Sequence, residues 1–193
     1  MNIIELNNLK LKTFIERDAE DYCLLNNINP SDIIELYLFN NELTDISGIK
    51  LFKNLEKLGL SRNRLTDISV LKDLKDLKNI KELFLGDNKI TDISDLNFLI
   101  VLKNLNLFSN NIIDISVLKN LNELEYLNIN NNLIKDISVI QYLTKLKLLD
   151  IRDLELESDQ IEYINSCKNL KILYYENGFK DMSIIELLPD NIK

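Results

Sequence analysis

The side chains that most often carry catalysis are scarce in this chain of 193 residues. It contains no histidine, which excludes the usual Ser-His-Asp and Cys-His arrangements and any imidazole metal site. None of its four glycines lies in a phosphate-binding loop or a dinucleotide fingerprint. Neither Cys23 nor Cys167 has a basic partner placed nearby by spacing, so we interpret both as structural thiols. The sequence therefore predicts no enzyme activity and no cofactor.

A recurring aspartate is the other group whose chemistry has to be interpreted. The string Asp-Ile-Ser begins at Asp45, Asp67, Asp92, Asp114 and Asp136. If these carboxylates were stacked ~5 Å apart in water, neighbours would repel each other by roughly 0.8 kcal/mol. One helix cap contributes about 1 kcal/mol, so capping offsets the repulsion without a cation. We interpret the aspartates as caps of short helical segments and predict no metal site.

Composition narrows the range of partners and compartments. The formal net charge is −8 and the pI is near 4.7. No basic cluster appears that could engage phosphates, so nucleic acid is not expected as a partner. No window approaches the ~18 consecutive apolar residues of a membrane span. Residues 1–12 carry Glu5, Lys10 and Lys12 where a signal peptide needs an unbroken apolar stretch, and two distant cysteines suit a reducing compartment. We expect a cytoplasmic protein. Delivery by a route that needs no signal peptide stays open.

The aspartates belong to an internal repeat, because they recur at intervals of 22, 25, 22 and 22 residues. Four residues before each aspartate stands an asparagine: Asn41, Asn63, Asn88, Asn110 and Asn132. Five and three residues before each asparagine stand two aliphatic residues: Leu36/Leu38, Leu58/Leu60, Leu83/Leu85, Leu105/Leu107 and Leu127/Ile129. A sixth, degenerate copy runs through Leu149, Ile151 and Leu154. We place a seventh copy on Ile172, Tyr174, Asn177 and Asp181.

The period dictates the architecture. Leu-x-Leu predicts a short strand with one buried face, and the chain must return about 22 residues later beside its own start. Strands then pair in parallel, and the leucines of successive coils stack into one core that no single coil could bury. This predicts an α/β solenoid, a right-handed superhelix with a parallel β-sheet on its concave face and short helical or 3-10 segments on its convex face. Each asparagine is expected to satisfy backbone groups of its own coil and the next.

The repeat also sets the expected organisation of the single domain. Residues 1–32 lack it and are predicted to form an amino-terminal helical cap, with a capping box in Thr13-Phe14-Ile15-Glu16 and a buried helix face at Ile15, Ala19 and Tyr22. Residues 33–188 form about seven coils, and residues 189–193 form a tail. The 25-residue copy holds three extra residues within 70–77, close to one added helical turn on the convex side. We expect the lysines at 72, 75, 78 and 81 to form a solvated convex face.

Strand residues that alternate with the leucines face outward in columns on the concave side. The columns are expected to end at Lys171, Leu173 and Tyr175 in the last coil. Several aromatics and small residues fall in them, and we take these with two flanking charged residues as the candidate partner-binding set: Tyr37, Phe39, Gly59, Ser61, Arg62, Phe84, Gly86, Asp87, Phe108 and Tyr126. Exposed aromatics on a rigid sheet are typical of interface hot spots, and the small residues predict a shallow floor between aromatic walls. The alternative is that the rings cover sheet backbone or pack on one another.

The string Leu36-x-Leu38-x-x-Asn41-x-Leu43-Thr44-Asp45-Ile46-Ser47, with its later copies, resembles the 22-residue leucine-rich repeats of bacterial internalins. It is also similar to the repeats of cytoplasmic phosphatase-regulatory leucine-rich proteins. The resemblance covers roughly residues 33–188. It implies a leucine-rich-repeat fold whose members bind partners on the concave strand face. Internalins are secreted, and this chain departs from them in showing no signal sequence and no wall-anchoring tail.

These observations together predict a non-catalytic module that binds a partner protein on its concave face. Two alternatives stay open. The chain could regulate a phosphatase or another enzyme, or it could assemble with itself through an exposed carboxyl-terminal coil, where few residues remain to shield the last strand edge.

Overall fold

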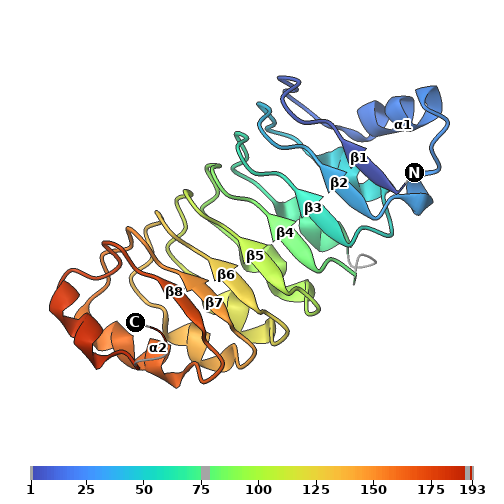
Figure 1. Cartoon of the computed structure of the whole chain (residues 1–193). Helices are drawn as coiled ribbons and strands as arrows, with labels where there is room; N and C mark the ends of the chain where they lie inside the picture. The colour runs from blue at the N-terminus through green and yellow to red at the C-terminus, as the bar shows by residue number, and fades with distance from the viewer. Residues whose placement is uncertain (1, 75–78, 190–191, 193) are drawn as a thin grey trace.

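The computed structural model describes residues 2–74, 79–189 and 192, and for residues 73 and 74 the backbone alone. Within these ranges eight strands form one parallel sheet in chain order (Figure 1): β1 (Ile3–Glu5), β2 (Glu35–Tyr37), β3 (Lys57–Gly59), β4 (Glu82–Phe84), β5 (Asn104–Asn106), β6 (Tyr126–Asn128), β7 (Leu148–Asp150) and β8 (Ile172–Tyr174). The α-helices are α1 (Glu16–Leu25) and α2 (Ile161–Ser166). None of the helices in the described ranges has the length and hydropathy needed to cross a lipid bilayer.

Short 3-10 helices return the chain on the other side of the core. They span Pro30–Asp32, Ser47–Leu51, Ser69–Leu74, Ser94–Phe98, Ser116–Asn120, Ser138–Tyr142, Ser158–Gln160 and Met182–Leu187. Figure 1 shows these segments behind the sheet, on the convex side. The middle residue of every strand is buried between the two layers, as Leu83 and Leu105 illustrate. The predicted solenoid is therefore confirmed, because the leucines of successive coils do stack into one continuous core.

The recurring asparagines form a buried ladder along the stack. Asn110 is typical: its Nδ2 donates to the carbonyl of Leu107 in its own coil at 3.0 Å and to Leu85 in the coil before at 3.1 Å. Its Oδ1 accepts from the backbone N–H of Ile90, also in the preceding coil, at 3.0 Å. The predicted bridging role is confirmed, but the partner coil is the preceding one and not the next.

The recurring aspartates cap the 3-10 helices, as predicted. In each Asp-Ile-Ser string the aspartate Oδ1 accepts a hydrogen bond from the backbone N–H of the serine two residues later, at 2.7 to 2.8 Å. At Asp92 this bond from the Ser94 backbone, helped by the Ser94 hydroxyl, lowers the pKa of the carboxyl group. Asp181 repeats the arrangement with Ser183 at 2.9 Å. The aspartate column is thus explained by local hydrogen bonding.

The amino-terminal cap differs from its prediction in three ways. It contains strand β1, which pairs with β2 and was not predicted. Helix α1 begins at Glu16, and the capping carboxylate is Asp18, whose Oδ2 accepts from the Ile15 backbone N–H at 3.0 Å. The predicted capping box at 13–16 is wrong, because its acid is too early by two residues. The buried helix residues are Ala19 and Cys23, with Tyr22 half-buried and Ile15 exposed.

The 25-residue coil keeps the sheet in register. Lys57 of β3 pairs with Glu82 of β4 as residues 22 apart do elsewhere, so the extra residues lie outside the strands. The 3-10 helix Ser69–Leu74 is correspondingly longer than its neighbours. The rest of the predicted added turn, and the lysines at 75 and 78, lie outside the described residues.

The last coil corrects the predicted register. Leu173 of β8 pairs with Leu149 and is buried, whereas Ile172 and Tyr174 face outward. The predicted columns ending at Lys171, Leu173 and Tyr175 are therefore shifted by one residue. The cause is a shorter turn: Phe179 bridges Leu156, so the segment from Leu173 to Phe179 is one residue shorter than in the earlier coils.

Candidate functional site

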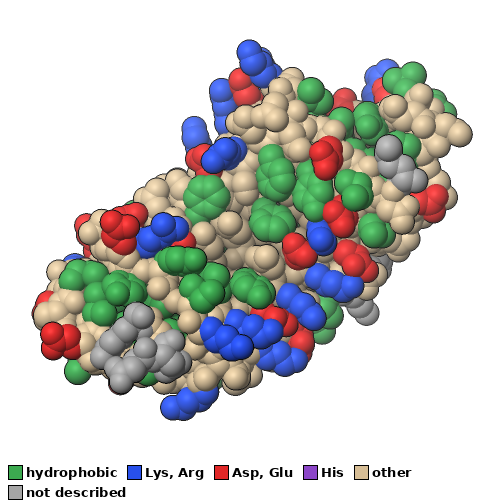
Figure 2. All heavy atoms as spheres, viewed as in Figure 1, with side chains coloured by type: hydrophobic (Ala, Val, Ile, Leu, Met, Phe, Trp, Pro, Cys, Tyr) green, Lys and Arg blue, Asp and Glu red, His purple; other side chains and the backbone are tan. Residues whose placement is uncertain are grey.

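The candidate site is the concave face of strands β2 to β5 and the turns that follow them. Four aromatic rings lie there half-buried, those of Tyr37, Phe39, Phe84 and Phe108. The ring centroids of Tyr37 and Phe39 are 5.5 Å apart and stacked, and those of Phe39 and Phe84 are 6.1 Å apart and edge-on. Figure 2 shows hydrophobic side chains gathered over these strands. We call these four residues the aromatic patch.

Two glycines beneath the aromatic patch explain how the rings lie so close to the sheet. A Cβ on Gly59 would sit 2.3 Å from Cζ of Phe39, and one on Gly86 would sit 2.0 Å from Cδ1 of Phe108. The rings thus lie directly over glycine backbone, which only a residue without a side chain allows. The predicted open floor at the glycines is wrong, because the rings occupy it.

Open space remains at Ser61, between two of the rings. A pocket of about 440 Å³ is lined by Phe39, Ser61, Arg62 and Phe108, together with the asparagines at 7, 8 and 40. Ser61 is buried at its base. Arg62 and Asp87 are both exposed, and both adopt positive φ in the turns that follow β3 and β4. Their side chains therefore flank the aromatic patch at the carboxyl ends of these strands.

Charged residues line the opposite edge of the aromatic patch. Lys57 lies between two carboxylates, 3.6 Å from Glu35 and 3.3 Å from Glu82, and these ion pairs raise its pKa. The Tyr37 hydroxyl donates to Glu35 at 2.7 Å. Burial, then this hydrogen bond, raises the pKa of Tyr37, so its hydroxyl stays a neutral donor. The edge is held in place by its own ion pairs.

Tyr126 does not join the aromatic patch. It lies on β6, two strands from Phe84, and its cross-strand neighbours are Asn104 and Leu148. Between Phe84 and Tyr126 the concave face of β5 is polar, with Asn104 and Asn106. The structure thus brings together nine of the ten predicted site residues and separates Tyr126 from them.

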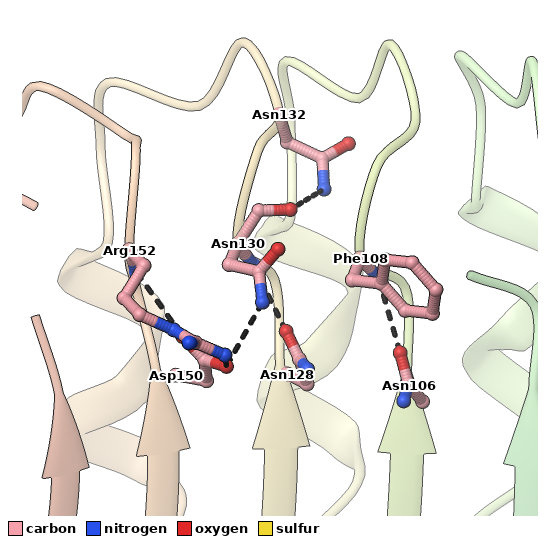
Figure 3. Close-up of polar contacts among 7 residues, drawn as sticks. All are labelled: Asn106, Phe108, Asn128, Asn130, Asn132, Asp150 and Arg152. Carbon is pink, nitrogen blue, oxygen red and sulfur yellow. Dashed lines mark hydrogen bonds and ion pairs between the residues drawn. The ribbon is translucent and has the colours of Figure 1, made fainter. Parts of the chain in front are cut away.

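The polar part of the concave face holds a network that was not predicted from the sequence (Figure 3). Asn128 Oδ1 accepts from the Asn130 backbone N–H at 3.1 Å, and Asp150 Oδ1 accepts from that of Arg152 at 3.2 Å. Asp150, only 2% exposed, also receives two bonds from the Arg152 guanidinium, at 2.9 and 2.7 Å, and one from Asn130 Nδ2 at 2.9 Å. Arg152 lies 5.3 Å from the ring centre of Tyr174. The signal that could have predicted this network is the Asn or Asp repeated in one outward column, at Asn106, Asn128 and Asp150.

The two thiols are buried and provide a first prediction. Burial raises the pKa of Cys167 to about 11 and also raises that of Cys23. At pH 8 only ~0.1% of Cys167 is then thiolate, the reactive form. We expect a disulfide reagent such as DTNB to label neither thiol readily in the native protein and both in denaturant. Rapid labelling of either thiol in the native protein at pH 8 would contradict the burial of that thiol.

Comparisons with known proteins agree with this geometry. The family model described as Leucine Rich repeats (2 copies) matches residues 31–73, 53–98 and 100–142. A search of curated proteins finds no match. Among solved structures, internalin C2 of Listeria monocytogenes is similar, with 29% identity and a TM-score of 0.79 over 99% of this chain and 78% of that one.

Two further structures give the same result. The internalin inlF of Listeria monocytogenes has 25% identity and a TM-score of 0.76, over 100% of this chain and 59% of that one. A leucine-rich-repeat protein of Leptospira interrogans has 25% identity and a TM-score of 0.72, over 98% of this chain and 53% of that one. The resemblance of the repeats to those of internalins is thus confirmed.

Proposed function

Because the chain belongs to the leucine-rich-repeat family, whose domains generally serve protein–protein interaction, we propose that it is a non-catalytic module that binds a partner protein on its concave face. The observation that carries the proposal is the aromatic patch. Four rings lie together on a sheet whose coils are fixed to one another by hydrogen bonds. Rings held in this way lose little conformational entropy on binding, and a few such anchors carry most of an interface's free energy.

Arg62, Asp87 and the ion-paired edge give the patch a polar surround. Charged groups at the rim of an interface set orientation and association rate more than affinity. The pocket above Ser61 offers room for one partner side chain between Phe39 and Phe108. We therefore place the affinity in the aromatic patch and the orientation in its rim.

The test compares baits that differ at single residues. The protein and its Phe84→Ala variant are used to capture partners from the native host, and the affinity for the main partner is then measured by calorimetry. We expect Phe84→Ala to weaken binding by at least ~2 kcal/mol, about thirtyfold, because it removes the ring that packs on Phe39. Gly59→Arg should also abolish binding, because any side chain there displaces the Phe39 ring.

Tyr142→Ala is the matched control, because Tyr142 is an exposed aromatic on the convex 3-10 helix Ser138–Tyr142. It should leave affinity unchanged, and thermal melts of all variants check that they fold. Equal affinity for Phe84→Ala, Gly59→Arg and Tyr142→Ala would move the site away from the aromatic patch. The identity of the captured protein separates the alternatives: a phosphatase indicates a regulatory subunit, and a second copy of this chain indicates a scaffold.

A further inference from the structure

The first outward column of the sheet changes character along the solenoid. On β2 to β5 it holds charged or polar residues: Glu35, Lys57, Glu82 and Asn104. On β6 to β8 it holds Tyr126, Leu148 and Ile172, which pair across adjacent strands. Tyr126 is 41% exposed, Ile172 is 45% exposed, and Tyr174, two residues along β8, is 47% exposed. We call Tyr126, Leu148, Ile172 and Tyr174 the apolar row.

A line of lysines runs directly beside the apolar row. The residues preceding β5, β6, β7 and β8 are Lys103, Glu125, Lys147 and Lys171. They are neighbours in space, because the backbone N–H of each donates to the carbonyl of the one before at 2.8 Å. Figure 2 shows lysines or arginines beside hydrophobic side chains in this part of the face. We call Lys103, Lys147 and Lys171 the lysine edge.

The lysine edge carries more positive than negative charge. Glu125 accepts a hydrogen bond from Lys147 and lies 4.0 Å from the Nζ of Lys103, so two ammonium groups share one carboxylate. That hydrogen bond is the largest of the effects that lower the pKa of Glu125. Within the described part of the chain Lys171 makes no ion pair. This edge is therefore locally basic on a chain whose net charge is −8.

We propose that the apolar row and the lysine edge together bind an acidic segment of a partner protein that carries large apolar side chains. The inference rests on the proposed function in taking the partner to be a protein, but it does not need the aromatic patch. Charge complementarity selects the segment, because the acidic remainder of the surface repels it and the lysine edge attracts it. The apolar row supplies the affinity, as exposed Tyr and Ile side chains lose water on contact.

The geometry sets the minimum length of the segment. Tyr126 and Ile172 are separated by two strand spacings, roughly 9.6 Å at ~4.8 Å each, which about three extended residues cross. Such a segment would lie on the apolar row and keep acidic side chains within reach of the lysine edge. Nucleic acid would contact the lysine edge through its phosphates but would leave the apolar row exposed to water, so a peptide segment fits this surface better.

The test uses three synthetic peptides: one of alternating Glu and Leu or Phe, one with Lys in place of Glu, and one with Ser in place of the apolar residues. Their binding to the full chain is followed by amide shifts in two-dimensional NMR. We expect only the acidic apolar peptide to bind, with shifts centred on β6 to β8. Lys147→Glu with Lys171→Glu should weaken it by about tenfold or more, and so should Ile172→Ser.

Matched controls keep the result specific. Lys119→Glu alters an exposed lysine of the convex helix Ser116–Asn120, and Ile113→Ser alters an isoleucine that is 65% exposed elsewhere. Both should leave binding unchanged, as should Phe84→Ala, which tests the proposed function separately. The proposal would be overturned if the acidic apolar peptide did not bind, or if Ile172→Ser left its affinity unchanged. It would also be overturned if a short DNA duplex bound equally well.

Discussion

Asn110→Ala is expected to lower the free energy of unfolding by about 2 to 3 kcal/mol. The change leaves the Ile90 backbone N–H buried without its acceptor, which costs most of this energy. The carbonyls of Leu85 and Leu107 lose one donor each but keep a second, from Asn88 and Asn132 respectively. Denaturant melts of the variant and the parent protein measure the loss.

Asn106→Ala, in the same coil, is the control. Asn106 is half-buried on the concave face and accepts one bond, from the Phe108 backbone N–H at 3.2 Å, where water can replace it. Its effect should be well below that of Asn110→Ala. If the two melts coincide, the ladder does not stabilise the stack as described.

Arg152→Met is expected to cost about 3 kcal/mol, the lower end of the range for removing one partner of a buried ion pair. Asp150, which is 2% exposed in the parent protein, would keep only Asn130 and one backbone N–H as donors. The loss falls at the lower end because the Arg152 side chain is 42% exposed, so water replaces part of what it supplies. Chemical denaturation at pH 7 gives the value.

Two further variants separate this effect from surface charge in general. Lys145→Met removes a lysine paired with Glu123 where both side chains are well exposed, and it should change stability little. Adding Asp150→Asn to Arg152→Met removes the uncompensated buried charge and should recover much of the loss. A double variant as unstable as the single one would show that Asp150 is not the cause.

The repeats could be predicted because each of their recurring residue types meets one physical requirement. A leucine in the strand fills the core, an asparagine at the turn satisfies buried backbone groups, and an aspartate caps a 3-10 helix. Where a coil lacks these residues, or where its turn changes length, the prediction failed. Strand β1 was missed because Leu9, exposed, stands where the later coils have their asparagine, which leaves no ladder signal in residues 1–32.

The last coil shows why local motifs mislead. Asp181-Met182-Ser183 fixes one end of the coil, and counting back from it by the usual interval makes Ile172 and Tyr174 appear to be core residues. The turn from Leu173 to Phe179 is one residue shorter, and Asn177 adopts positive φ there and does not join the ladder. A strand has a period of two, so this single residue exchanges the buried and exposed faces.

The candidate site was predictable in its members but not in its packing. Alternation along the strands is enough to say that Tyr37 and Phe84 face outward. It does not say that Phe39 and Phe108 cover the glycines of neighbouring coils, because ring placement depends on side-chain rotamers. The Asp150–Arg152 network was missed for the same reason, since each residue alone looks like an ordinary surface charge.

The direction of the asparagine ladder has a consequence for how the protein is made. Every ladder asparagine from 41 to 132 bonds to backbone of the coil that precedes it. Synthesis delivers the chain from its amino terminus, so the groups each new asparagine requires have already left the ribosome when it emerges. Each coil can lock onto a finished neighbour at once, with α1 and β1 as the starting template. The solenoid is thereby suited to growing one coil at a time, at the pace of translation.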